Sequence, residues 1–146
     1  MDWKFNGWAK YKNFKYDNNI CSEIKKNLDL KVVQPSIKNR KIVLEGGSID
    51  VNGKGALITT LECLQSKVQE RNPGLKKKDY ENLFKKFLGV SKVIWLNKGI
   101  SGDDTHGHVD DIARFVDKKK IFIAFENNKK DTNYKALKEN YRIINE

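Results

Sequence analysis

The fold is decided by two stretches, KIVLEGGSIDVNGKGALITT at residues 41–60 and KKDYENLFKKFLGVSKVIWL at residues 77–96. In the first stretch apolar runs flank Asn52-Gly53, and an Asn-Gly pair in that setting is typical of a β-hairpin. In the second, apolar residues recur at helical spacing up to Leu88, Gly89 follows, and a β-branched and aromatic run comes next. Together they predict one β-β-α-β unit with strands at 42–44, 49–51 and 56–60, a helix at 77–88 and a strand at 92–96.

The same order of elements starts again toward the C-terminus. The pattern predicts a strand at 107–115, a partner strand at 121–125 and a helix at 133–140. From Glu45 to His108 is a step of 63 residues, and the two predicted helices begin about as far apart. We therefore expect an internal repeat of β-β-α-β modules.

The N-terminal part resembles the end of an earlier copy of the module. Ile20, Ile24 and Leu28 form one apolar stripe, which predicts a helix at 17–28, and a short strand is expected at 31–33. The organisation predicted from these patterns is the end of one module at 1–40, a complete module at 41–99 and an incomplete one at 100–146. We expect a chain that begins and ends inside repeats to be a fragment.

The most chemically loaded segment is DDTHGHVDD at residues 103–111, which holds four carboxylates and both histidines of the chain. If the segment is an extended strand, alternate side chains share a face, so His106, His108 and Asp110 would lie together. A proton carrier would then be next to an acidic group. We expect part of any functional site to lie here.

Composition and charge indicate an ordinary globular domain with a basic surface. The 146 residues include 29 Lys and Arg against 19 Asp and Glu, a net charge of +10, and 38% are hydrophobic. The basic residues occur in short scattered clusters in which lysine dominates, a pattern more typical of solvated surface than of nucleic-acid recognition. We expect no nucleic-acid partner.

Cysteine usage and hydropathy restrict the location of the chain. Cys21 and Cys63 are the two cysteines, no CxxC pair occurs, and no charged start precedes an apolar signal region. No apolar run approaches the ~20 residues needed to span a bilayer. The sequence predicts a reduced, cytoplasmic chain with no membrane contact, no cofactor and no metal ligands.

Several motifs in series resemble one known family. They are FNGW at 5–8, LEGGSIDVNGKGALITTLECL at 44–64, RNP at 71–73, LGVSKVIWLNKG at 88–99 and GDDTHGHVDDIARFV at 102–116. In this order and spacing they are similar to the agmatine deiminase and bacterial-type (Porphyromonas-type) peptidylarginine deiminase family. The resemblance implies the pentein fold, an α/β propeller of five β-β-α-β modules, of which residues 1–146 would cover about two to three.

The resemblance also implies roles for particular residues. His108 matches the general acid/base, Asp110 a carboxylate that grips the guanidinium nitrogens, and Glu45 the carboxylate that pairs with the histidine and the substrate. Carboxylates suit this task because the planar guanidinium fork is best held by bidentate acceptors. From the residues themselves, Gly46 and Gly47 are expected both to form a bulge and to let the substrate approach the backbone. Trp8 is expected in the core or in the wall of the channel and is assigned to the substrate-binding residues.

The neighbouring residues are given plainer roles. Asp103, Asp104 and Asp111 are expected to be turn and surface acids, and His106 a variable neighbour of the site. Arg114 is expected to pair with an acid that the sequence does not identify.

The implied reaction converts agmatine and water to N-carbamoylputrescine and ammonia, a step of putrescine biosynthesis. A cysteine thiolate attacks the guanidinium carbon, ammonia leaves, and water resolves the thiouronium. Neither Cys21 nor Cys63 lies in the glycine-rich context of the family's nucleophile. We therefore expect the chain alone to be inactive, with a complementing C-terminal segment or a second copy left open as its partner.

Three alternatives remain at the level of sequence. The substrate could be free arginine or peptidylarginine, which share the guanidinium, or the chain could be a non-catalytic module of the same fold. A third reading comes from residues 105–111, THGHVDD, which resemble the THxHxDH zinc motif of metallo-β-lactamase-type hydrolases. This last reading is weaker, because Asp111 stands in place of the final histidine and no further histidine is available.

Overall fold

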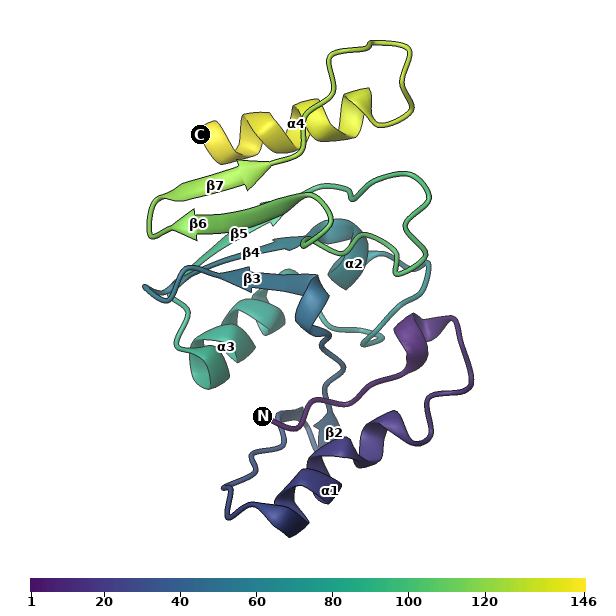
Figure 1. Ribbon diagram of the computed structural model, residues 1–146, viewed down its shortest axis with the longest axis vertical. Helices are drawn as coiled ribbons and strands as arrows, with labels where there is room; N and C mark the ends of the chain where they lie inside the picture. Colours follow the sequence, from purple (N-terminus) through teal and green to yellow (C-terminus); the bar gives the residue numbers. More distant parts are fainter.

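A three-stranded sheet forms the centre of the computed structural model, which describes residues 1–146 (Figure 1). Strand β3 (Ile49–Val51) pairs antiparallel with β4 (Ala56–Thr60), and β5 (Lys92–Leu96) lies parallel on the other side of β4. Helix α3 (Lys77–Leu88) connects β4 to β5 and covers one face of the sheet. The predicted hairpin, helix and final strand of the β-β-α-β unit are confirmed.

Alternation along β4 sends neighbouring side chains into two separate cores. Leu57 belongs to a core shared with the α3 residues Tyr80 and Phe84, whereas Ile58 belongs to a second core with Val109 and Leu137. All of these side chains are buried. The central sheet is therefore covered on both faces, which explains the continuous apolar run of its middle strands.

The second face is covered by the C-terminal part of the chain. Strands β6 (Ala113–Asp117) and β7 (Lys120–Ile123) form a separate two-stranded hairpin, and α4 (Tyr134–Asn145) packs beside β5. The predicted strand at 121–125 and helix at 133–140 are confirmed, and the helix runs five residues further. Figure 1 shows this layer at the opposite end of the long axis from the N-terminal segment.

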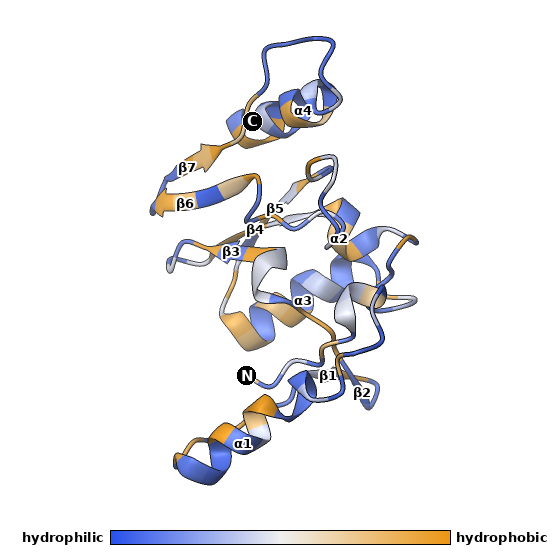
Figure 2. Ribbon diagram, turned by 45° about the vertical axis from the view of Figure 1, so that its right-hand side comes forward, coloured by the Kyte–Doolittle hydropathy of each residue, from blue (hydrophilic) through white to orange (hydrophobic).

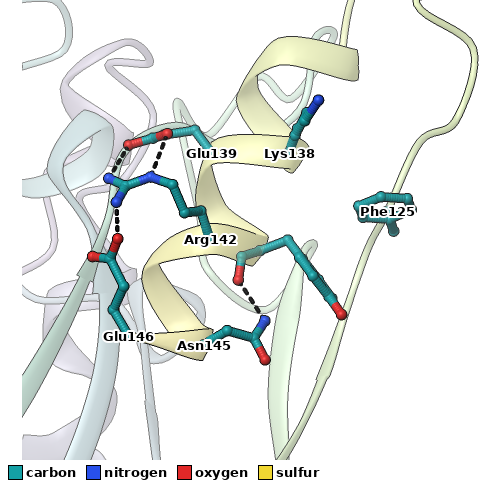
Figure 3. A pocket seen from close by; sticks show the side chains of 7 residues that line it. Phe125, Lys138, Glu139, Arg142, Asn145 and Glu146 are labelled. Carbon is teal, nitrogen blue, oxygen red and sulfur yellow. Dashed lines mark hydrogen bonds and ion pairs between the residues drawn. The ribbon is translucent and has the colours of Figure 1, made fainter.

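An exposed pocket lies between α4 and the segment that follows β7, and it is lined mostly by side chains of the helix (Figure 3). Its volume is about 570 Å³. Arg142 donates hydrogen bonds to Glu139 and Glu146 on successive turns, and Phe125 stacks edge-on with Tyr141. Such exposed i,i+3 and i,i+4 pairs support the helix by a few tenths of a kcal/mol each.

The N-terminal forty residues form a separate layer of short elements. They comprise η1 (Gly7–Ala9), η2 (Asp17–Asn19), α1 (Ile20–Asn27), β1 (Ser36–Ile37) and β2 (Arg40–Lys41). The helix predicted at 17–28 is confirmed, but the residues of its apolar stripe are about half exposed. Figure 2 shows α1, with apolar and polar residues along it, at the far end of the molecule from the central sheet. The strand predicted at 31–33 is wrong, because that segment is irregular and the β1–β2 hairpin forms after it instead.

The strand predicted at 42–44 is also wrong, although its residues are deeply buried. Its only strand-like contact is a single bridge between Val43 and Lys4. The side chain of Asn72 takes the place of a partner strand, because it accepts from the Val43 amide at 2.9 Å and donates to the Val43 carbonyl at 2.8 Å. The backbone groups are thus satisfied without a sheet.

The strand predicted at 107–115 is wrong in its first half. Residues 103–112 form a series of turns, and β6 begins only at Ala113. His106 and Gly107 have φ values of 68° and 87°, which turn the chain out of the extended conformation. The alternation argument for the histidines therefore does not apply to this segment.

No helix of this chain combines the length and the apolar character that crossing a bilayer demands.

Candidate active site

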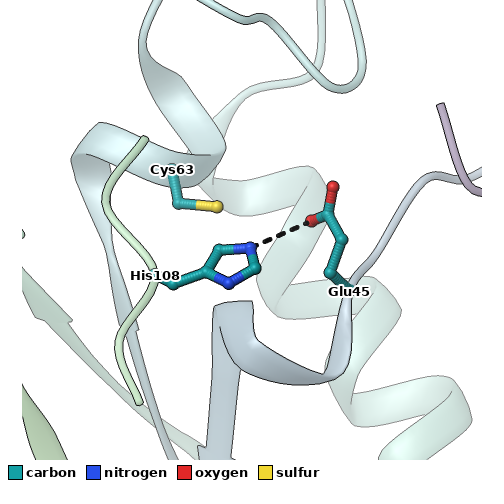
Figure 4. Close-up of side chains that lie close together, drawn as sticks. All are labelled: Glu45, Cys63 and His108. Atoms are coloured by element: carbon teal, nitrogen blue, oxygen red, sulfur yellow. Dashed lines mark ion pairs between the residues drawn. The ribbon is translucent and has the colours of Figure 1, made fainter. Parts of the chain in front are cut away.

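Glu45 and His108 face each other in the interior, although 62 residues separate them (Figure 4). Glu45 precedes the short helix η3 (Gly46–Ser48), and His108 lies in the turn segment before β6. The distance from Glu45 Oε2 to His108 Nε2 is 4.0 Å, and both side chains are more than nine-tenths buried. These two atoms have no hydrogen-bond partner within the chain. Both groups are therefore open to a ligand placed between them.

Arg71 fixes the other oxygen of Glu45. Its Nε donates to Glu45 Oε1 at 2.9 Å, and its side chain is fully buried. The two terminal nitrogens donate to the carbonyls of Gln69 and Thr105, so each of the three guanidinium nitrogens has a partner. A buried charge is tolerated only when it is paired and hydrogen-bonded. Here the Arg71 guanidinium and the Glu45 carboxylate neutralise and hydrogen-bond each other.

Gly47 lets the two halves of the site approach each other. Its carbonyl accepts from the amides of Val109 and Asp110, at 3.0 and 3.3 Å. A Cβ atom on Gly47 would lie 2.5 Å from His108 Nδ1 and 2.9 Å from Asp110 Oδ2, too close for any side chain. Gly46 differs, because a Cβ there would meet nothing within 4 Å. The absence of a side chain is thus required at Gly47 by the packing of His108 and Asp110, whereas the approach of a substrate to both glycines stays a prediction.

Asp103 shapes the segment that carries His108. Its carboxylate accepts from the amides of Thr105, Gly107 and His108 at 2.8, 2.7 and 3.1 Å, and from the Thr105 hydroxyl. Partial burial alone would raise the pKa of Asp103, but these hydrogen bonds outweigh it and hold the pKa below its ordinary value. Its expected role as a simple turn acid understates its contribution.

The last residue of β4 also contacts the segment that carries His108. The hydroxyl of Thr60, the last residue of the strand, donates to the carbonyl of Gly107 and also accepts from the amide of Cys63. Thr60 is thereby the N-cap of α2 (Leu61–Gln65) and an anchor for the residue before His108. The sheet therefore sets the position of the histidine.

Asp110 lies on the solvent side of the site. Its Oδ1 is 4.0 Å from His108 Nδ1, and its side chain is 37% exposed. The imidazole thus lies between the carboxylates of Glu45 and Asp110, one near each ring nitrogen. Asp111, next in sequence, is exposed, and its pKa is raised by partial desolvation and by the charges of Asp103 and Asp110. Arg114 pairs with Asp50, the acid that the sequence did not identify.

His106 does not share the face of His108. Its Nε2 lies 3.0 Å from Ser66 Oγ, and it lines a pocket of about 950 Å³ that contains neither Glu45 nor Asp110. The alignment of His106, His108 and Asp110 expected from an extended strand is therefore absent. The alternative zinc motif built on these three residues has no support in the geometry.

Cys63 lies beside the pair, on α2. Its Sγ, a nitrogen of His108 and a carboxylate oxygen of Glu45 all lie within 4.8 Å of one another (Figure 4). Burial raises the pKa of the Cys63 thiol to about 12, against the opposing charge of Arg71. A thiol in this environment stays protonated at neutral pH and is a weak nucleophile.

Trp8 lies in the N-terminal segment and reaches the site indirectly. Its ring stacks edge-on with Phe5 and Tyr11, and its carbonyl accepts from the Gln69 side chain at 3.0 Å. Gln69 in turn accepts from Arg71 through its own carbonyl. The assignment of Trp8 to the substrate-binding residues stays a prediction.

Sequence reasoning missed Arg71, Asp103 and Cys63 as neighbours of the site. The available signal for Arg71 was its place in RNP at 71–73, one of the motifs that resemble the family. For Asp103 the signal was its spacing of two, four and five residues from the amides it accepts, typical of an Asx-type turn. Cys63 carries no local signal, because only the fold brings it to His108.

A family model identifies the relatives of this chain. The model of the Porphyromonas-type peptidyl-arginine deiminases matches residues 1–146. The chain belongs to this family. The agmatine deiminase of Medicago truncatula is 41% identical over 146 residues, which are 99% of this chain and 38% of that protein.

Solved structures show the same fold. A C. jejuni agmatine deiminase, a cysteine-to-serine variant with substrate bound, is 31% identical with a TM-score of 0.85 over 98% of this chain and 41% of its own. The agmatine deiminase of Enterococcus faecalis is 32% identical with a TM-score of 0.84, over 97% and 39%. The predicted pentein-type α/β fold is confirmed, and the chain spans about 40% of the length of the curated relatives it matches.

Proposed function

We propose that this chain supplies the guanidinium-holding part of an agmatine deiminase, which hydrolyses agmatine to N-carbamoylputrescine and ammonia. The observation that carries the proposal is His108 between two carboxylates, with Glu45 Oε2 and His108 Nε2 buried and unpartnered. A guanidinium offers several N–H donors and one positive charge, so it satisfies both the free oxygen of Glu45 and the exposed carboxylate of Asp110. The family membership and the agmatine deiminases among the relatives support the same substrate class.

In the proposed reaction His108 moves protons while the carboxylates hold the cation. A thiolate adds to the guanidinium carbon, His108 donates a proton to the departing nitrogen, and ammonia leaves. His108 then takes a proton from water, which adds to the same carbon, and the carbon–sulfur bond breaks to give the ureido product. Glu45, held by Arg71, and Asp110 keep the guanidinium in place through both steps.

The thiolate in this scheme comes from outside these 146 residues. Cys63 is close to His108, but its buried thiol keeps its proton at neutral pH. We therefore expect the chain alone to hold a guanidino compound without converting it, and a complementing segment to be its functional partner. Cytoplasmic action, in keeping with two free cysteines, is part of the same proposal.

Agmatine is proposed over arginine and peptidylarginine on the strength of the relatives. Three guanidino compounds would satisfy the carboxylates equally, since they differ at the end remote from the guanidinium. The curated relatives that match nearly all of this chain are named agmatine deiminases. The family takes its name from peptidyl-arginine, and the similar solved structures also include one named a peptidyl-arginine deiminase and one named an arginine deiminase.

The experiment is a chimera in which residues 1–146 replace the corresponding part of the Medicago truncatula enzyme. We expect the chimera to form N-carbamoylputrescine and ammonia from agmatine, and His108→Ala or Asp110→Asn to abolish this conversion. Product is followed by mass spectrometry, with arginine and a peptide ending in arginine as competing substrates.

The matched control variants are His106→Ala and Asp111→Asn, which change neighbouring residues of the same types outside the proposed site. A chimera that elutes and melts like the parent enzyme, yet makes no ureido product, would point to a non-catalytic module. Faster conversion of arginine or of the peptide would transfer the proposal to that substrate.

A further inference from the structure

Three potential metal ligands from three separate segments meet in the interior. They are Glu45 before η3, Cys63 on α2 and His108 in the turn segment before β6, and their donor atoms all lie within 4.8 Å of one another. All three residues are buried. The proposed guanidinium chemistry uses Glu45 and His108 but leaves Cys63 without a function.

A second observation points to a ligand at the same place. Glu45 Oε2 and His108 Nε2 are both buried without a hydrogen-bond partner, and they are directed at each other across 4.0 Å. This separation is too long for a hydrogen bond and wide enough for a small cation to bridge. The other oxygen of Glu45 is held by Arg71 at 2.9 Å, so Oε2 is fixed in orientation as an outer-shell hydrogen bond would fix a metal ligand.

The donor set selects the kind of ion. A thiolate, an imidazole nitrogen and one carboxylate oxygen suit a borderline-soft divalent ion, whereas Mg²⁺ and Ca²⁺ prefer oxygen ligands. In a tetrahedral site with bonds of about 2.0–2.3 Å the ligand atoms lie roughly 3.3–3.8 Å apart. The Glu45–His108 separation of 4.0 Å exceeds this by less than about 1 Å, and the separations from Cys63 Sγ, which are no longer than 4.8 Å, by up to about 1.5 Å. Rotation of the Cys63 and His108 side chains would bring the three donor atoms together.

We propose that Glu45, Cys63 and His108 form a zinc site, with the fourth position left to a water molecule. On binding, the Cys63 thiol releases its proton to solvent and the thiolate coordinates the ion. Arg71 carries a positive charge beside the ion, but it is already paired with Glu45. The Cys63 thiolate adds a second negative charge, which offsets part of the repulsion between Arg71 and the ion.

Zinc at this place would compete with the substrate. The ion would occupy Glu45 Oε2 and His108 Nε2, the two groups that the guanidinium and the leaving nitrogen need. Zn²⁺ would therefore act as a reversible inhibitor of the complete enzyme, relieved by a chelator. Only this consequence rests on the proposed function, since zinc binding by itself is measured without substrate.

The test is a titration of chelator-treated protein with Zn²⁺ alone, in competition with a chromophoric chelator. We expect one equivalent to bind. Since the loss of an outer-shell partner alone typically costs 10–100-fold in affinity, Cys63→Ala should weaken binding by at least about tenfold. Cys21→Ala and His106→Ala are the matched controls, because they remove the other cysteine and the other histidine, and both should bind Zn²⁺ as the unaltered chain does.

A measurement on the unaltered chain guards against a variant that fails to fold. X-ray absorption of the zinc-loaded protein should show one sulfur at about 2.3 Å and nitrogen or oxygen ligands at about 2.0 Å. Substitution by Co²⁺ should give a thiolate charge-transfer band that Cys63→Ala loses and Cys21→Ala keeps. The proposal would be overturned by any of three results. They are a protein that takes no Zn²⁺ from the chelator, zinc bound without a sulfur ligand, and a folded Cys63→Ala variant that binds Zn²⁺ as tightly as the unaltered chain.

Discussion

At the residue scale, the pairing of Arg71 with Glu45 is the contact on which the site depends. We expect Arg71→Met to lower the free energy of unfolding by about 3 kcal/mol, because it leaves the Glu45 carboxylate buried without its counter-charge. Urea unfolding followed by circular dichroism measures this. Arg114→Met is the matched control, since Arg114 is 55% exposed in its pair with Asp50 and should cost less than about 1 kcal/mol. Equal costs for the two variants would contradict the assigned role.

Gly47 gives a second prediction at this scale. Gly47→Ala places a Cβ atom within 2.5 Å of His108 Nδ1, so the histidine or the Glu45 segment must move. Since a misplacement of about 1 Å can cost about 100-fold in rate, we expect a loss of that order in agmatine conversion by the chimera. Gly46→Ala, where a Cβ meets nothing within 4 Å, should keep most of the activity. The prediction is wrong if the two alanine variants are equally active.

The reactivity of Cys63 gives a third prediction at the residue scale. With its pKa raised to about 12 by burial, the thiol should not react with iodoacetamide in the folded chain at pH 8. Cys21, which is partly exposed, should be modified first. Mass spectrometry of the native and the urea-unfolded protein measures both. Rapid modification of Cys63 in the native state would reopen the question of whether it is the nucleophile.

The site residues that belong to recognisable motifs could be predicted from the sequence, whereas contacts between residues far apart in the chain could not. The motifs around Glu45 and His108 singled out both residues, and the structure places them together. Arg71 could not be assigned from the sequence, because its partners are Glu45 and the Thr105 carbonyl, 26 and 34 residues away. Such long-range contacts leave no periodic pattern.

At the scale of elements, the turn segment 103–112 depends on the ionised carboxylate of Asp103. Because the pKa of Asp103 is lowered in the folded chain, its carboxylate stabilises the fold at pH values above the ordinary pKa of an aspartate. This contribution is lost as the pH falls through the folded pKa. We expect Asp103→Asn to cost about 1–2 kcal/mol near neutral pH and less in acid.

Stability measured from pH 7 to pH 3 tests this prediction. The control is Asp111→Asn. The pKa of the Asp111 carboxyl group is raised in the folded chain, so its charge disfavours the folded state at pH values above the ordinary pKa of an aspartate. That variant should be neutral or slightly more stable at pH 7. An Asp103→Asn variant with a pH profile parallel to that of the unaltered chain would show that the carboxylate does not hold the segment.

The elements differ in how well the sequence foretells them. The helix at 77–88 and the strand at 92–96 were predicted to the residue, because amphipathic spacing, Gly89 at φ 68° and β-branched residues agree locally. The segment at 107–115 failed, since a side chain, Asp103, takes up amides that a sheet would use. The segment at 42–44 failed for the same physical reason, with Asn72 as the competing group.

At the scale of the whole molecule, the candidate site lies where the β3–β4–β5 sheet meets the C-terminal part of the chain. The Gly47 carbonyl accepts from the amides of Val109 and Asp110, and the Phe115 amide donates to Asp50 at 2.6 Å. The division into repeated modules stays a prediction. The docking of these two parts could not be predicted, because it depends on contacts across more than sixty residues. The exposed stripe of α1 remains unpaired within the chain.

The proposed function requires that these 146 residues hold a guanidinium through Asp110 and Glu45. An NMR titration of ¹⁵N-labelled chain with agmatine tests it most directly, with putrescine, which lacks the guanidinium, as the matched ligand. We expect agmatine to shift the amides of His108 and Asp110 and putrescine to leave them unchanged. Asp110→Asn should lose the response, and Asp111→Asn should keep it. Equal responses to both ligands, or an undiminished response in Asp110→Asn, would contradict the proposed function.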